Sequence, residues 1–144
     1  MTVRMMSEAD IDAVAALECQ VFSGEWTRDV LLHHLSSDNQ LSIVADEDGA
    51  LLGYLLGICV AGEAEVYSFA VNPRYRKQGI GEQILDSFIN EAGAQSVESC
   101  FLEVRCSNYA AIRLYRKVGF ENVGLRKNYY HNPPEDGFIM RLDI

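Results

Sequence analysis

Arg76-Lys77-Gln78-Gly79-Ile80-Gly81 is the stretch that decides the fold of this 144-residue chain. It follows a strand-like run at Val66–Val71, and it leads into a helical pattern with a clear apolar stripe. A tight loop at a helix start leaves backbone N–H groups without intrahelical partners, and the two glycines let a ligand approach that backbone. The helix N-terminus and the charges of Arg74, Arg76 and Lys77 favour an anion. The junction therefore predicts a pyrophosphate-binding loop.

An ordinary strand-to-helix turn is the alternative interpretation, because two glycines in a loop are a weak signal. Gly81 is followed by Glu82-Gln83, so the Lys-Ser/Thr pair of the common nucleotide-binding loop is missing, and no G-x-G-x-x-G occurs. The choice between the two interpretations depends on the rest of the chain.

Composition indicates a single folded domain, residues 1–144, that contacts no membrane. The chain is 49% hydrophobic and 23% charged, which is typical of a globular protein. No apolar run is long enough to span a bilayer, and the N-terminus lacks a basic region followed by an apolar stretch, so we expect a cytoplasmic protein. The four cysteines show no metal-ligand spacing; we expect buried, reduced thiols and no metal. They are Cys19, Cys59, Cys100 and Cys106.

Charge is distributed unevenly along the chain. The net charge of −9 argues against nucleic-acid binding. Residues 1–73 hold two basic and twelve acidic groups (net −10), whereas residues 74–144 hold ten basic and nine acidic groups (net +1). This asymmetry is either ordinary surface solvation or a sign of function, in which a polyanionic cofactor lies near the basic groups and the acidic half attracts a cationic substrate.

Periodicity and turn signals predict a mixed α+β domain with helices between mostly antiparallel strands. The predicted strands are residues 2–5, 41–45, 51–60, 66–71, 100–105, 123–130 and 138–142. Helices are expected to begin at Ser7, at Thr27, after the glycine loop and at Asn108. Gly119 supplies the stop for the last helix.

Glu103 is a carboxylate in the middle of an apolar strand, Cys100–Arg105. Because side chains alternate along a strand, Phe101, Glu103 and Arg105 share one face. Glu103 is either paired with a nearby arginine or a general base in a site. The surroundings of Arg105 stay open at this point.

Asn108 and Tyr115 fall on one stripe of the last predicted helix. Asn108 fits a helix cap, and Tyr115 taken alone fits a core aromatic. Beside a strand that carries Glu103, the two residues also fit one functional site.

The segment Val66–Phe120 resembles the GNAT acetyltransferase superfamily: R-x-x-G-x-G follows a strand, and a second strand precedes N-x-x-A-x-x-x-Y and a closing G-F. Within this superfamily, the chain resembles the bacterial RimI-type ribosomal-protein alanine N-acetyltransferases more closely. That similarity rests on Leu102–Arg105, Ser107-Asn108, Asn128–Tyr130 and Ile139-Met140, and on Ala110-Ala111-Ile112 with Leu114-Tyr115.

The resemblance implies a GNAT fold, a mixed and mostly antiparallel central sheet with flanking helices, in which the fourth and fifth strands splay apart. Acetyl-CoA would lie in the opening as co-substrate, with no metal. Glu103 matches the general base of the family and Tyr115 its general acid. The cofactor-binding residues that the resemblance implies are Phe69, Ala70, Val71, Arg76, Lys77, Gln78, Gly79, Ile80, Gly81, Asn108 and Tyr115.

The expected substrate is the α-amine of a protein N-terminus, such as the N-terminal alanine of a small-subunit ribosomal protein. An α-amine has a pKa of about 7.7–8.0, so a base is needed to free it at neutral pH. Phe22-Ser23-Gly24-Glu25-Trp26 stands where RimI-type chains carry Phe-Pro-Trp, which leaves the peptide preference open. Trp26, Tyr129 and Tyr130 are expected to wall the peptide groove, although strand filling explains the two tyrosines equally well.

Two other functions stay open. One is acetylation of lysine side chains or of a small amine at the same cofactor site. The other is a CoA-sensing module without turnover, which would need neither Glu103 nor Tyr115 as a proton-transfer group. We expect a monomer or a weak dimer.

Overall fold

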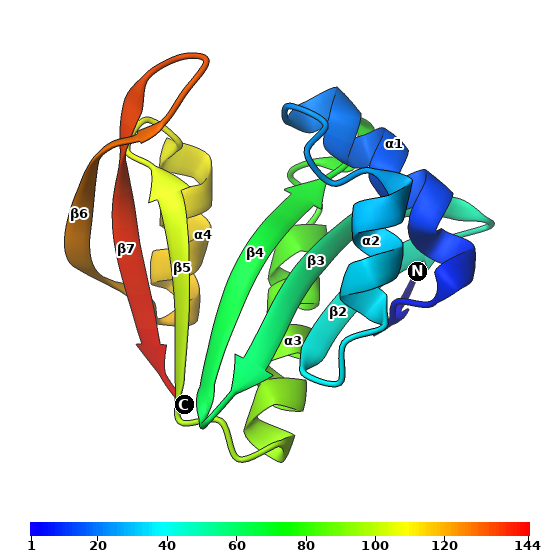
Figure 1. Cartoon of the computed structure of the whole chain (residues 1–144), viewed down its shortest axis with the longest axis horizontal. Coiled ribbons are helices and arrows are strands. Elements are labelled where there is room, and N and C mark those ends of the chain that lie inside the picture. The colour runs from blue at the N-terminus through cyan, green and yellow to red at the C-terminus, as the bar shows by residue number, and fades with distance from the viewer.

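The computed structural model describes residues 1–144 as one seven-stranded sheet with helices on both faces (Figure 1). The strands are β1 (Thr2–Met5), β2 (Gln40–Glu47), β3 (Ala50–Val60), β4 (Glu63–Val71), β5 (Ser99–Arg105), β6 (Glu121–Tyr130) and β7 (Glu135–Asp143). The helices are α1 (Ile11–Val21), α2 (Arg28–Leu35), α3 (Ile80–Ala94) and α4 (Tyr109–Val118), with short 3-10 turns at Glu8–Asp10 and Pro73–Tyr75. No helix is both long and apolar enough to cross a bilayer.

The sheet is antiparallel except at its centre. Its strand order is β1-β2-β3-β4-β5-β7-β6, and only β4 and β5 run parallel. This confirms the predicted α+β class and the mostly antiparallel sheet.

The parallel seam between β4 and β5 is short. Glu63, Ala64 and Glu65 pair with residues 99–101, and the pairing stops there. On the other edge of β4 the register shifts, because Leu56 lies opposite Ser68 and Gly57 opposite Val66, which leaves Tyr67 as a bulge. A bulge bends its strand, so β4 turns away from β5 directly after the last pair. Figure 1 shows the two strands meeting at one end and separating towards the other, which is the splay that the resemblance implies.

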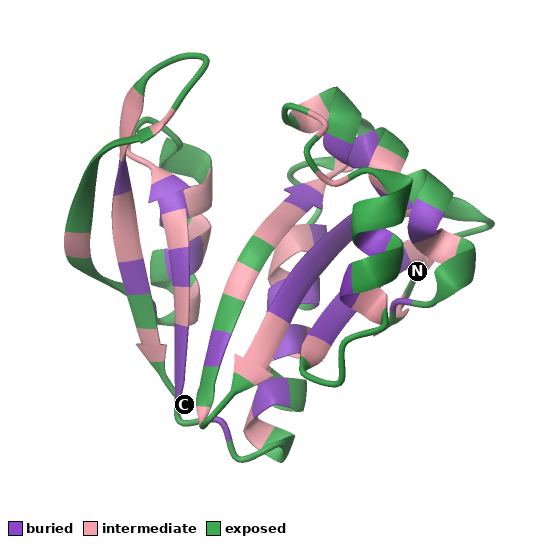
Figure 2. Cartoon of the chain, viewed as in Figure 1, coloured by how far each residue is buried: buried purple, intermediate pink, exposed green.

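Two hydrophobic clusters lie on opposite faces of the sheet. The larger one, of 19 buried residues, packs under α3 and α4, and the smaller one, of nine, packs under α1 and α2. We call these sides the α3–α4 face and the α1–α2 face. Figure 2 shows the buried positions concentrated in β2, in β3 and on the sheet-facing sides of the helices, while the edge strand β6 is largely exposed.

Local capping explains where the helices begin and end. The Thr27 hydroxyl accepts a hydrogen bond from the Val30 amide at 3.4 Å, and the Asn108 side-chain oxygen accepts one from the Ala111 amide at 3.2 Å. Gly119 ends α4 at φ 119°, a conformation that L side chains rarely adopt. These predicted boundaries are confirmed.

Several strands extend beyond their predicted ends. β4 begins at Glu63 rather than at Val66, and β7 begins at Glu135 rather than at Phe138, so the loop between β6 and β7 is only residues 131–134. Backbone pairing continues through polar residues that carry no hydrophobic signal, and the prediction missed them for that reason.

The prediction that all four cysteines are buried is wrong. The four thiols are free, but only Cys100 is buried, while Cys19 is exposed and Cys59 and Cys106 are half-buried. Cys19 lies in α1, whose inward positions are taken by Val14, Leu17 and Glu18, so its side chain points outward.

Candidate active site

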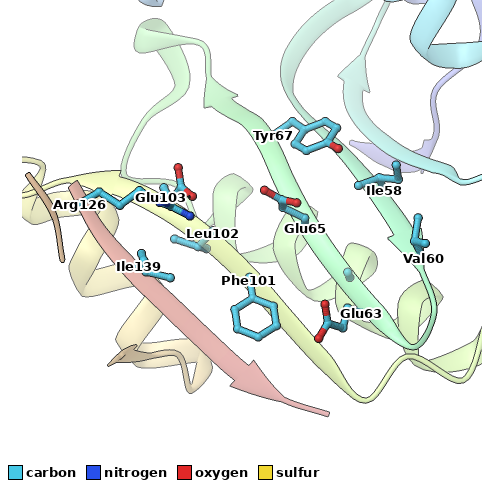
Figure 3. Close-up of a pocket in the computed structure, with 11 residues that line it drawn as sticks. Ile58, Val60, Glu63, Glu65, Tyr67, Phe101, Leu102, Glu103, Arg126 and Ile139 are labelled. Carbon is cyan, nitrogen blue, oxygen red and sulfur yellow. Dashed lines mark hydrogen bonds and ion pairs between the residues drawn. The ribbon is translucent and has the colours of Figure 1, made fainter. Parts of the chain in front are cut away.

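A hollow of about 350 Å³ lies on the α1–α2 face, across the seam between β4 and β5. It is lined by Ile58, Val60, Glu63, Ala64, Glu65, Tyr67, Phe101, Leu102, Glu103, Arg126 and Ile139. Figure 3 shows Glu65 projecting from β4 and Glu103 from β5 on either side of the seam, with Arg126 beside Glu103. The hollow therefore combines apolar side chains with charged groups: Glu63 lies at the paired end of the seam, and Glu65, Glu103 and Arg126 lie where the two strands begin to separate.

Glu103 reaches this hollow because side chains alternate along β5. Leu102 and Val104 enter the core under α3 and α4, so Glu103 faces the other side. Its carboxylate accepts a hydrogen bond from Arg126 Nε at 3.0 Å, and its side chain is 19% exposed. The alternative that Glu103 pairs with an arginine is therefore confirmed, although the pair leaves the carboxylate at the edge of the hollow.

Tyr129 lies close enough to Glu103 for the carboxylate to affect its pKa. The pKa of Tyr129 is raised to about 12, first by a hydrogen bond to the Glu103 carboxylate and then by burial. The Arg126 guanidinium lies over the Tyr129 ring at 5.6 Å. Arg126 thus orients the carboxylate from the β6 side. An exposed ion pair of this kind contributes only about 0–1 kcal/mol, so Arg126 can move aside at low cost.

Glu65 supplies a second carboxylate to the hollow. Burial raises its pKa, the charge of Glu103 raises it further, and Arg126 lowers it. The lining of the hollow thus carries three carboxylates, Glu63, Glu65 and Glu103, and one guanidinium, that of Arg126. This excess of negative charge favours an incoming ammonium group.

Tyr115 lies on the opposite face of the sheet. It is buried in the larger core cluster, and its ring centroid lies 6.2 Å from that of Phe69 and 5.7 Å from that of Phe120. The core interpretation of Tyr115 is thus confirmed, and the structure does not bring it into the hollow with Glu103. Burial raises its pKa above the ordinary tyrosine value, so the phenol keeps its proton at neutral pH and can act only as a proton donor.

The predicted pyrophosphate loop forms an exposed turn at the start of α3. Lys77 and Gly79 adopt left-handed conformations, with φ 63° and 78°, and Gly79 caps the helix without a side-chain hydrogen bond. The first amide groups of α3 therefore have no partner within the helix. A Cβ at Gly79 would meet nothing within 4 Å, whereas one at Gly81 would lie 3.3 Å from Leu114 and from Val71, so Gly81 serves packing.

The edge of β4 beyond Glu65 has no strand partner on the β5 side. Ala70 and Val71 lie in this unpaired stretch, and Arg76 Nε donates to the Val71 carbonyl oxygen at 3.4 Å. An unpaired strand edge can bind an extended chain of amide groups as an added strand does. The unpaired edge, the cationic loop and the free amide groups at the start of α3 together fit a long ligand with amides at one end and phosphates at the other.

Trp26 packs against Tyr67, one of the residues that line the hollow. Its ring stacks on Tyr67 at a centroid distance of 6.3 Å and meets His34 edge-on at 5.3 Å. His34 is buried, its Nε2 lies 3.1 Å from the Ser42 hydroxyl oxygen, and burial lowers its pKa. Opposite, Tyr129 and Tyr130 meet edge-on at 5.0 Å.

Sequence reasoning missed Arg126, Glu65 and Tyr67. The predicted strand 66–71 contains Tyr67, but no sequence signal marks the bulge there. Glu65 lies outside that predicted strand, and Arg126 is one of several polar residues in the predicted strand 123–130. Alternation along β4 places Glu65 and Tyr67 on one face once the strand start is known, so a longer predicted strand could have found them.

Comparison with known proteins agrees with this geometry. Residues 11–120 match the acetyltransferase (GNAT) family, and the chain belongs to that family. It is an N-acetyltransferase, and GNAT acetyltransferases use acetyl-CoA as co-substrate. The chain is 36% identical to the N-alpha-acetyltransferase RimI of Mycobacterium tuberculosis, with 99% of this chain and 92% of the relative covered.

Solved structures extend the similarity to three dimensions. The crystal structure of the ribosomal-protein-S18-alanine N-acetyltransferase from Escherichia coli is 30% identical, covers 99% of this chain and 93% of its own, and superposes with a TM-score of 0.91. Ard1 from Thermoplasma volcanium is 29% identical, with coverage of 99% and 97% and a TM-score of 0.88. The recognition of a GNAT fold of the RimI type is therefore confirmed.

Proposed function

We propose that this chain transfers an acetyl group from acetyl-CoA to the α-amine of a protein N-terminus, with the N-terminal alanine of ribosomal protein bS18 as the first candidate. The observation that carries the proposal is the position of Glu103. This carboxylate stands at the mouth of a negatively charged hollow beside a strand edge that can bind the cofactor. A relative named for N-alpha-acetylation supports the reaction, and one named for the alanine of bS18, which matches 99% of this chain, supports the substrate.

The proposed cofactor site uses backbone groups. Phe69, Ala70 and Val71 bind the pantetheine arm through the free edge of β4. Amides from Arg76 to Gly81 hold the pyrophosphate at the start of α3, where the helix dipole and the neighbouring cations favour negative charge. Asn108, which caps α4, contacts the arm. Acetyl-CoA supplies the acetyl thioester.

Glu103 acts as the general base in this proposal. A protonated α-amine enters from the α1–α2 face between Trp26 and the tyrosine pair, and Glu103 removes its proton directly or through one water. The free amine nitrogen bonds to the thioester carbon as the carbon–sulfur bond breaks. Tyr115, on the other face, gives its proton to the departing thiolate. The nitrogen loses its second proton to solvent as the amide forms, and solvent returns a proton to the Tyr115 phenolate and takes one from Glu103, so the proton balance closes without a covalent enzyme intermediate.

The test is acetylation of peptides that carry the bS18 N-terminal sequence. One peptide has a free N-terminal alanine and an internal lysine, and its control is identical except for a blocked N-terminus. Mass spectrometry should find one acetyl group on the α-amine of the free peptide and none on the control. Acetylation of the lysine in the blocked peptide, or no product despite acetyl-CoA binding, would overturn the proposal.

A further inference from the structure

Arg105, the last residue of β5, connects that strand to the loop between β6 and β7. Its Nη1 donates to the Pro133 carbonyl oxygen at 2.9 Å and to Glu135 Oε1 at 3.3 Å, and its Nη2 donates to the His131 carbonyl oxygen at 3.1 Å. The same guanidinium lies over the Tyr130 ring at 4.5 Å. One side chain thus contacts both ends of the four-residue loop.

Glu135 completes the connection from the other side. Its Oε2 accepts a hydrogen bond from the Ser107 amide at 2.7 Å, at the turn that leads into α4. The first residue of β7 is therefore fixed to the β5–α4 turn, while its second carboxylate oxygen meets Arg105. The side chains of both partners are at most 30% exposed, so water screens the pair only in part.

The loop that Arg105 fixes carries residues of the candidate site. Tyr130 ends β6 directly before it, and the ring of Tyr130 packs edge-on against Tyr129, which reaches Glu103. The β6–β7 register shifts between Arg126 and Tyr130, so strand pairing alone holds this end of the hairpin weakly. The planar guanidinium of an arginine can donate hydrogen bonds to two carbonyl oxygens and a carboxylate at once. A lysine ammonium cannot reproduce this geometry.

We propose that Arg105 is a positioning residue that holds the β6–β7 hairpin against β5, and thereby sets Tyr129 and Tyr130 as one wall of the groove that receives the peptide N-terminus. This inference rests on the proposed function for its substrate. Arg105 touches neither reacting group in the proposal. Its loss should loosen the wall without changing the cofactor loop, which lies on a different part of the sheet.

The test compares Arg105→Lys and Arg105→Gln with Arg141→Lys. Arg141 is a matched control, because it also pairs with a carboxylate, Asp143, and lies over an aromatic ring, Phe101, but at the far end of β7. Both Arg105 variants should raise the peptide KM about tenfold or more, leave the acetyl-CoA Kd within about twofold and keep the melting temperature near that of wild type. Arg141→Lys should leave the peptide KM unchanged.

Hydrogen exchange of the hairpin separates the two proposals. Amides of residues 128–137 should exchange at least tenfold faster in Arg105→Lys than in wild type, whether or not a substrate is known. Glu135→Gln, which weakens the same connection from the β7 side, should shift exchange in the same direction. Unchanged exchange and an unchanged peptide KM in both Arg105 variants would overturn the inference. A wild-type enzyme that acetylates no peptide would overturn the proposed function, and the exchange result would still decide the role of Arg105.

Discussion

Replacing Glu103 with glutamine removes the proton acceptor and keeps the shape of the site. The glutamine side-chain oxygen can still accept the hydrogen bond from Arg126 Nε that Glu103 now accepts at 3.0 Å. The side chain keeps its volume and its place between Arg126 and Tyr129. A change in rate therefore reports on proton transfer rather than on a collapsed hollow.

The magnitude follows from what else the hollow contains. Removing a general base costs about 10²–10⁴-fold in rate. Glu65 lines the same hollow, and its carboxylate, with a pKa raised by burial, can substitute in part through water. We therefore expect the lower end of the range for Glu103→Gln, about 10²-fold in kcat, or about 2.7 kcal/mol of barrier.

The pH dependence gives the sharper assay. At about pH 6.5 an α-amine with a pKa of about 7.7–8.0 is mostly protonated, whereas at about pH 9 it is mostly free. The loss in Glu103→Gln should therefore be largest at low pH and shrink to about tenfold or less at high pH, measured as initial rates of peptide acetylation at saturating acetyl-CoA. Wild-type rates for Glu103→Gln at low pH would refute the assignment.

The matched control is Glu65→Gln, which changes a carboxylate of the same hollow by the same chemistry. It should alter kcat by less than about threefold, because Glu65 belongs to β4 and lacks the direct contact with Arg126 that orients Glu103. A loss in Glu65→Gln as large as that in Glu103→Gln would transfer the role of base away from Glu103.

Three further predictions concern the acid, the cofactor loop and the fold. Tyr115→Phe keeps the ring between Phe69 and Phe120 and should lower kcat about 10²-fold with an unchanged acetyl-CoA Kd by calorimetry; an unchanged kcat would exclude the phenol. Gly79→Ala puts a side chain on a residue at φ 78°, a strain of about 1–2 kcal/mol, and should weaken acetyl-CoA binding about 5–30-fold. The control Gly49→Ala is equally strained, at φ 80°, but lies in the distant β2–β3 turn and should leave acetyl-CoA binding unchanged. The pKa of Asp10 is lowered in the folded protein, mainly by its hydrogen bonds from Arg4. Asp10 therefore stabilises the fold at pH values above about 3.9, the pKa of an unfolded aspartate, and this contribution is lost as the pH falls. Asp10→Asn should therefore lower the melting temperature at neutral pH by about 3 °C, equivalent to about 1 kcal/mol for this partly exposed pair, and the difference from wild type should vanish in acid.

Local chemistry made the helix boundaries and the cofactor loop predictable. Thr27, Asn108 and Gly119 act within a few residues of their own positions, so their roles can be inferred without knowing the fold. The glycine loop was predictable for the same local reason, because a strand pattern, a turn signal and an apolar helical stripe follow one another directly in the sequence. Glu103 was predictable for the same reason, since a carboxylate in an apolar strand is unusual wherever the strand lies.

The partners of Glu103 could not be predicted, because they depend on register. Arg126 lies on β6, which reaches β5 only across β7, and the β6–β7 pairing shifts twice, between Asn122 and Gly124 and again between Arg126 and Tyr130. A shift of one residue moves every later side chain to the opposite face. Alternation in the sequence of β6 therefore gives no reliable face for Arg126 or for Tyr129.

Glu18 shows a different limit of sequence reasoning. A glutamate is expected on the exposed side of a helix, yet Glu18 is 2% exposed, and its Oε2 has no hydrogen-bond partner. Burial raises its pKa, and the backbone amides of Trp26, Glu25 and Gly24 offset this in part. Only the return of the chain over the end of α1 creates that environment, so no local signal could reveal it.

The bulge at Tyr67 explains how two residues on opposite faces can serve one reaction. Before it, Ala64 and Val66 pack towards α3 and α4; after it, Phe69 and Val71 do so, while Ala70 packs with the cluster under α1. The extra residue thus both reverses the alternation and bends β4 away from β5. In the proposed reaction Glu103 takes a proton on the α1–α2 face, and Tyr115 gives one on the α3–α4 face. Because the sheet separates them everywhere except at the opening, neither group can neutralise the other directly. Restoring regular pairing between β4 and β5 would therefore abolish turnover even with both residues intact.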